Sequence, residues 1–158
     1  MLVKEKFRVK GSLQVVWQFM LDPERIGSCV PGCEKIETLG EGSYQSTIRI
    51  KLPIFSITAT STTTITETDP PHHLKSITDG KYDLGGGTFH QEMVLDMKEV
   101  DGGEVEVSYS AETTLEGGLS GFSEDLMGTM AHGVAEQFAK NIRARIEGTE
   151  EGSAVDDE

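Results

Sequence analysis

Two cysteines, Cys29 and Cys33, bracket a Val-Pro-Gly stretch, and their type and spacing are the first hint of chemistry in this sequence. A structural zinc site needs four ligands, and the four histidines of the chain are scattered through predicted turn, strand and helix. A redox Cys-x-x-Cys motif has two intervening residues, whereas three separate this pair. A disulfide across Pro31 and Gly32 is sterically possible. We interpret the cysteines as small apolar residues packed beside a turn, and we predict no metal site.

Other motifs that could hold a ligand or catalyse a reaction fit structural roles better. His72 and His73 are adjacent, and neighbouring residues of a strand point to opposite faces, so we interpret them as part of a solvated turn. The run from Gly85 to Gly87 leads into a predicted strand, whereas a phosphate-binding loop leads into a helix N-terminus. No Gly-x-Ser-x-Gly nucleophile elbow occurs, and most strand acids fall on the outward-facing parity. We therefore predict no bound cofactor, and we assign no catalytic residue.

Composition and charge narrow the class of protein. The chain has 158 residues, which suits one domain, and its net charge is −13, which disfavours nucleic acid and anionic membranes as partners. No apolar run approaches the ~20 residues of a membrane span, and the N-terminus is not a secretory signal, so we expect a cytoplasmic protein. Residues 148–158 contain five acids and no base, which predicts a disordered acidic tail after a domain of residues 1–147.

The hydropathy pattern predicts a strand, two short helices, a run of strands and one long helix. The first strand is Val3 to Lys10, and Ser12 and Asp22 are good N-caps for the two short helices. Residues 34–116 alternate apolar and polar side chains, as in an antiparallel sheet with one covered face. The first short helix is expected to bury Val15, Val16 and Phe19. The long helix, about 122–146, carries an apolar residue at every fourth position: Leu126, Met130, Val134, Phe138, Ile142 and Ile146.

One long helix is too narrow to cover a curved sheet of six or seven strands, so an α+β fold with a hollow between helix and sheet is expected. The residues predicted to line this cavity are Trp17, Phe55, Ile57, Ser61, Phe89, Gln91, Met93, Tyr109, Met127, Met130 and Val134. Trp17 either closes the core or gates the cavity. Inward-facing polar residues such as Ser61, Thr63, Gln91 and Thr113 either bond to one another or to trapped water, or orient the polar head of an apolar ligand.

Short motifs spread over residues 3–146 resemble the CoxG family of carbon monoxide dehydrogenase subunits, within the START-like (SRPBCC) superfamily. The most specific motif is Pro31-Gly32-Cys33-Glu34, which follows the Trp17 helix and an Asp-Pro-Glu helix start. The others are Phe7-Arg8-Val9, Val16-Trp17, Asp22 to Ile26, Glu67 to Pro71, Asp83 with Gly85 to Gly87, Tyr109 to Ala111, and Gly117-Gly118-Leu119. The resemblance implies the helix-grip fold, in which a curved antiparallel sheet surrounds the long C-terminal helix. It also implies that the loop of Cys29, Pro31, Gly32 and Cys33 lies at the cavity mouth.

The resemblance further implies a lipid- or quinone-like ligand and a molybdenum-containing dehydrogenase as partner. Two departures bear on this. Acids follow Gly118-Leu119 where relatives carry a base, and this chain ends in an acidic tail instead of an extension proposed to reach the membrane. We therefore expect ligand binding without a direct membrane anchor. Two alternatives remain: an enzyme of cyclase or hydrolase type acting on an aromatic substrate, which needs an inward charged group, and a protein-interaction module with a filled core.

Overall fold

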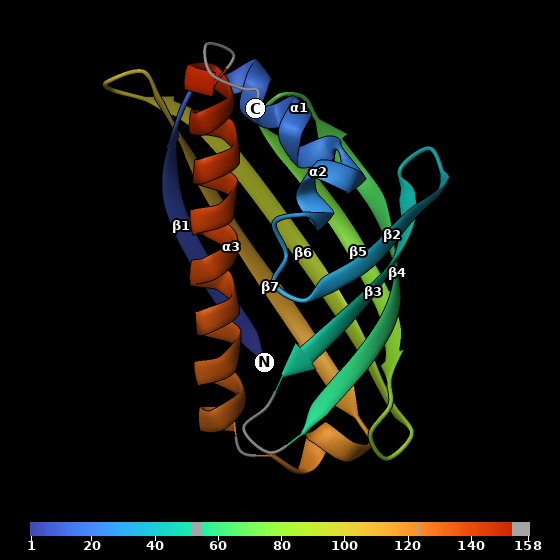
Figure 1. Ribbon diagram of the computed structural model, residues 1–158. Helices are drawn as coiled ribbons and strands as arrows, with labels where there is room; N and C mark the ends of the chain where they lie inside the picture. Colours follow the sequence, from blue (N-terminus) through green and yellow to red (C-terminus); the bar gives the residue numbers. More distant parts are fainter. Residues whose placement is uncertain (52–54, 123, 153–158) are drawn as a thin grey trace.

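The computed structural model describes residues 1–51, 55–122 and 124–152, and arranges them as a curved sheet with its helices on the concave side (Figure 1). The strands are β1 (Leu2–Lys10), β2 (Cys33–Gly40), β3 (Ser43–Lys51), β4 (Ser56–Asp69), β5 (His73–Tyr82), β6 (Gly87–Val100) and β7 (Glu104–Glu116). The helices are α1 (Leu13–Leu21), α2 (Pro23–Gly27), the short 3-10 helix η1 (Gly118–Gly121) and α3 (Glu124–Gly152).

The seven strands form one antiparallel sheet in the order β1-β7-β6-β5-β4-β3-β2. The predicted sheet is confirmed, and the alternation of buried and exposed residues follows from its one covered face. Strand β5 is not evident in the hydropathy pattern, because its inward face mixes Leu74 with Ser76, Thr78 and Gly80. The turn predicted at His72 and His73 is correct only for the first, since His73 begins β5.

The two short helices begin where their caps predict. Ser12 accepts a hydrogen bond from the backbone N–H of Val15 at 3.2 Å, and Asp22 accepts two from the first turn of α2. Helix α1 buries Val16, Trp17 and Phe19. The prediction that Val15 is buried is wrong: its side chain is 38% exposed, whereas the Trp17 side chain is only 3% exposed.

Helix α3 differs from the predicted helix in its end and in its buried face. It continues to Gly152, past the predicted end at Ile146 and into the acidic segment. The buried residues are Ala135, Ala139, Ile142 and Ile146, whereas Leu126 and Val134 are each 46% exposed. Four residues turn an α-helix by about 400°, so a row of every fourth residue winds about 40° per step. Only the C-terminal members of the predicted row therefore face the core.

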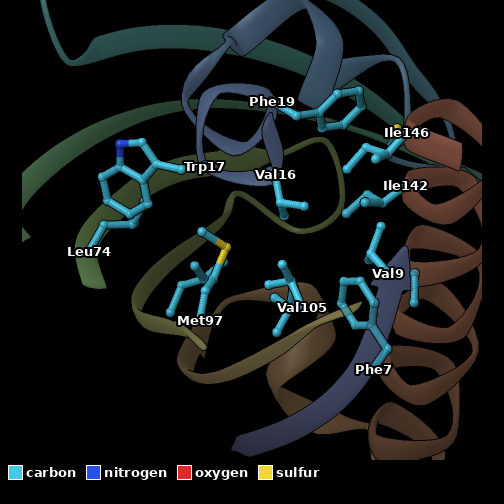
Figure 2. Packing of buried hydrophobic residues seen from close by; sticks show 14 residues of the cluster. Phe7, Val9, Val16, Trp17, Phe19, Leu74, Met97, Val105, Ile142 and Ile146 are labelled. Carbon is cyan, nitrogen blue, oxygen red and sulfur yellow. The ribbon is translucent and has the colours of Figure 1, made fainter. Parts of the chain in front are cut away.

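The core consists of two apolar clusters rather than one. The larger cluster joins α1, β1 and the C-terminal half of α3 over β5, β6 and β7, and Figure 2 shows Phe7, Val9 and Val105 facing Ile142 and Ile146. The smaller cluster lies toward η1 and contains Ile57, Ala59, Tyr82 and Leu119. The hydroxyl of Tyr82 fixes η1, because it accepts a hydrogen bond from Leu119 N–H at 2.9 Å and donates one to the Glu116 carbonyl at 2.8 Å.

The connection between β3 and β4 differs from the expected strand. Phe55 precedes β4, which begins at Ser56, and its side chain is 39% exposed rather than inward. Leu52, predicted to point inward, and Pro53, predicted as a turn, lie outside the described residues.

Candidate ligand-binding face

A continuous row of polar side chains crosses the concave face of the sheet. The strand registers align Thr113 of β7 with Gln91 of β6, Gln91 with Thr78 of β5, Thr78 with Thr63 of β4, and Thr63 with Tyr44 of β3. All five residues share the inward parity of the buried apolar residues on their strands. We call these five residues the polar row. They carry four hydroxyls and one amide and no charged group.

Members of the polar row are hydrogen-bonded to one another. Gln91 donates to the Thr113 hydroxyl at 3.1 Å, and the Thr63 and Thr78 hydroxyls lie 2.7 Å apart. Tyr44 also bonds to Thr63, and burial raises the pKa of the Tyr44 phenol. Beside the row, the buried hydroxyls of Ser46 and Ser61 are 3.1 Å apart. Of the alternatives that the sequence left open, mutual bonding is the one present here.

The polar row separates the two apolar clusters. On one side lie Leu95 and Met97 of the larger cluster, with Met93 packed against it. On the other side lie Ile57 and, packed against the smaller cluster, Phe89 and Met127. Phe89 lies across β5, where only a glycine leaves room: a Cβ at Gly80 would be 2.6 Å from its ring. The concave face is thus apolar on both sides of a strip of uncharged polar groups.

The N-terminal half of α3, residues 125–134, lies on the concave side of the sheet, and it buries no described side chain (Figure 1). Helix α3 as a whole packs mainly against β1 (Figure 1). Met127 reaches the smaller cluster, Met130 is half-buried, and Val134 is exposed. Ala131 lies one turn after Met127, which packs against the smaller cluster, and two turns before Ala139 of the larger cluster. Helical periodicity therefore places Ala131 between the two clusters. The apolar side chains of this half are therefore the ones available to a guest over the polar row.

Of the predicted cavity residues, Trp17 belongs to the larger cluster, and Met93 and Tyr109 pack against it. Trp17 is 3% exposed and lies beside Leu74 in Figure 2, so of its two predicted roles it closes the core. Tyr109 is half-buried against the same cluster, beside Glu5 on the neighbouring strand. Burial raises the pKa of Tyr109 to about 12, and the charge of Glu5 acts in the same direction.

The loop from Cys29 to Cys33 is held at both ends. Cys29 is fully buried in the larger cluster, its thiol is free, and its carbonyl accepts a hydrogen bond from Asn141 of α3 at 2.9 Å. Gly32 has a φ of +84°, and its carbonyl accepts from the Arg49 N–H of β3 at 2.8 Å. Burial raises the pKa of both Cys29 and Cys33, which disfavours reactive thiolates. This supports the interpretation of the cysteines as packing residues.

The sequence reasoning missed an inward carboxylate. Glu5 shares the parity of Phe7 and Val9, and its side chain is only 22% exposed. Its Oε2 accepts a hydrogen bond from Nδ1 of His132 on α3 at 3.0 Å. The alternation of β1 was sufficient to predict the direction of Glu5, whereas its pairing with His132 depends on how α3 lies on the sheet. The other histidine–carboxylate groups, at His73 and His90, lie on the convex face.

Two surface depressions in the described part of the chain lie away from the polar row. One, of about 340 Å³, runs between β1 and α3 and includes Glu5 and His132. The other, of about 400 Å³, is on the convex side over β1, β6 and β7. No group of three potential metal-ligating side chains occurs within residues 1–51, 55–122 and 124–152. In the same ranges, no helix combines the length and apolarity needed to cross a membrane.

This fold, with a long helix lying along the concave side of a seven-stranded sheet, defines a START-like helix-grip domain. The model of the CoxG family of carbon monoxide dehydrogenase subunits matches residues 6–147. The chain therefore belongs to the CoxG family, as its motifs predict. No curated protein matches the chain significantly.

Solved structures support the fold at low sequence identity. A conserved protein from Geobacillus kaustophilus superposes with a TM-score of 0.85 at 22% identity, covering 94% of this chain and 97% of that one. A START superfamily protein from Mycobacterium smegmatis gives a TM-score of 0.72 at 13% identity, with 92% and 97% covered. An aromatase/cyclase from a Streptomyces species gives 0.66 at 15% identity, with 94% of each chain covered. Identities this low establish the fold alone.

Proposed function

We propose that this protein binds a hydrophobic small molecule between the N-terminal half of α3 and the polar row. The observation that carries the proposal is the arrangement of this face. Two apolar clusters flank a strip of neutral hydrogen-bonding groups, and the N-terminal half of α3, on the same side of the sheet, leaves Val134 46% exposed. Ligand sites are mostly apolar with a few polar groups that fix orientation, and this face has that composition.

The proposed ligand is mainly apolar and carries an uncharged hydrogen-bond acceptor, as a lipid- or quinone-like molecule does. Ser46 and Ser61 share one hydrogen bond between their two hydroxyls, and Tyr44, Thr63 and Thr78 share two bonds among three hydroxyls. Each group therefore has one more hydroxyl proton than it has bonds within the group. An acceptor on the ligand satisfies such a proton. Burial of several hundred Å² at about 25 cal/mol per Å² is enough for micromolar affinity after the cost of association.

Phe55 and the start of α3 fit the path of the ligand better than the loop of Cys29 to Cys33 that was predicted to lie at the cavity mouth. The carbonyls of Cys29 and Gly32 are bonded to α3 and β3, so moving that loop breaks two hydrogen bonds. Phe55 and Leu126 are exposed apolar side chains at the other end of the sheet. Membership of the CoxG family supports the further proposal that the bound molecule serves a molybdenum-containing dehydrogenase.

A binding assay with an apolar fluorescent probe, such as an anilinonaphthalene sulfonate, tests the proposal. Ala131→Trp places an indole between the clusters and should weaken probe binding about tenfold or more, whereas Thr129→Trp, on an exposed position of the same helix, should leave it unchanged. Unfolding curves of both variants confirm that they fold. Equal probe affinity in the wild type and in folded Ala131→Trp would reject this site, and absence of binding would favour the filled-core interaction module.

Glu5 supports a second candidate function, an enzyme of cyclase or hydrolase type. It is the inward charged group that such a reaction needs, and His132 and Tyr109 lie beside it. The aromatase/cyclase among the similar structures shares the fold but does not establish the activity. Turnover of an aromatic ester that Glu5→Gln abolishes would support the enzyme. Hydrolysis no faster than in buffer, together with tight probe binding, would reject it in favour of the binding protein.

A further inference from the structure

The two halves of α3 are attached to the rest of the molecule very differently. The C-terminal half buries Ala139, Ile142 and Ile146 in the larger cluster, and Ala135 is buried as well. It is also bonded to the α2–β2 loop through Asn141 and to β1 through Glu147, whose carboxylate accepts the Lys10 N–H at 3.0 Å. These contacts make it a fixed part of the core.

The N-terminal half, residues 125–134, has few such contacts. It buries no described side chain, and a Cβ added at Gly128 or Gly133 would meet nothing within 4 Å. The Thr129 hydroxyl bonds within its own helix. Among the described side chains of this half, His132 alone forms a hydrogen bond with another element, to Glu5 of β1. This bond joins the half to β1, in addition to the packing of Met127 and the partial burial of Met130 and Ala131.

The surroundings of His132 favour its charged form. Its Nδ1 lies 3.0 Å from Glu5, and its Nε2 lies 3.6 Å from Glu136 on the following turn. The hydrogen bond to Glu5, followed by the charges of Glu5 and Glu136, raises the pKa of His132. Three cations, Lys6, Lys140 and Arg143, line the same groove, and Tyr109 faces Glu5 from β7. The His132 cation is thus balanced by carboxylates on two elements.

We propose that the Glu5–His132 pair is a pH-sensitive latch that holds the N-terminal half of α3 against β1. A histidine with a raised pKa in the folded state adds stability that is fully present below its unfolded pKa of ~6.5. That contribution is lost as the pH rises through the folded value. The helix half is therefore held more tightly in mildly acidic solution and released above neutrality. The consequence of the latch for ligand exchange rests on the proposed function, in which the ligand lies between this half and the polar row.

Hydrogen exchange of the full chain measures the latch without any ligand. After correction for intrinsic exchange, amides of residues 125–134 should open about two- to fivefold more at about pH 8.5 than at about pH 6, as expected for an exposed ion pair. His132→Asn keeps a neutral hydrogen bond and should abolish this difference. His90→Asn is the matched control, since His90 also lies between two carboxylates, 2.6 Å from Asp79 and 3.2 Å from Glu92, but on the convex face.

A second measurement separates the latch from the proposed function. The apolar probe should dissociate faster at about pH 8.5 than at about pH 6 from the wild type, and at equal rates from His132→Asn. If no probe binds at either pH, the proposed function fails while the exchange experiment still decides the latch. A pH difference in exchange that persists in His132→Asn, or that disappears equally in His90→Asn, would overturn the latch.

Discussion

Replacing Thr63 with Val removes one hydroxyl of the polar row with little change in side-chain shape. The Thr63 side chain is buried, and its hydroxyl bonds to Thr78 at 2.7 Å and to Tyr44. The substitution leaves these two hydroxyls without a partner. A fully buried unsatisfied group costs about 1–3 kcal/mol, and because Thr78 and Tyr44 are half-buried we expect a total of about 1–2 kcal/mol. In a domain of this size that lowers Tm by roughly 2–8 °C.

Urea unfolding of a variant series measures this cost and its origin. Removing all three hydroxyls together, as Tyr44→Phe, Thr63→Val and Thr78→Val, should recover much of the loss, because no hydroxyl is then left unpaired. The sum of the single costs should therefore exceed the cost of the triple variant by at least ~0.5 kcal/mol. A loss below ~0.5 kcal/mol for Thr63→Val alone, or strictly additive costs, would show that the polar row is not an enclosed network.

Three further predictions concern the elements around the face. Ile142→Ala should destabilise the domain by about 2–5 kcal/mol in urea unfolding, whereas Val134→Ala on the same helix should change it by less than ~0.5 kcal/mol; equal costs would contradict the assigned buried face of α3. Gly32→Ala should lower Tm by several degrees, since its φ is +84° and its Cβ would lie 2.2 Å from a β3 carbonyl oxygen, and an unchanged Tm would refute this packing. Ultraviolet titration should find Tyr109 ionising with a pKa of about 12, and Glu5→Gln should lower this value only partly, because burial is the larger cause. Since the folded pKa is raised, the contribution of Tyr109 to stability should be lost as the pH rises above ~10, and a pKa for Tyr109 near 10 would contradict its burial.

The sequence was sufficient for the fold and the helix caps, because strand alternation and capping residues are local signals. The same alternation gave the inward direction of Tyr44, Thr63, Gln91 and Thr113. It could not show that they form one row, because that depends on strand registers. Thr78 was missed with the rest of β5, whose inward face has too little apolar contrast.

The position of α3 was beyond what the sequence pattern could give. Its apolar residues occupy more than half of the helix surface, so the pattern does not decide which side meets the sheet. The packing of Ala139 and Ile142 on β1 and α1 decides it, and it leaves Val134 exposed. The same packing brings His132 to Glu5, a pairing of residues far apart in the chain.

Native mass spectrometry of the protein purified from its own host tests the central claim, that α3 and the polar row hold an apolar guest. We expect one bound neutral, apolar molecule per chain in the wild type and in Thr129→Trp, and none in Ala131→Trp. The same bound mass in all three proteins, or an unliganded mass in every one, would contradict this claim.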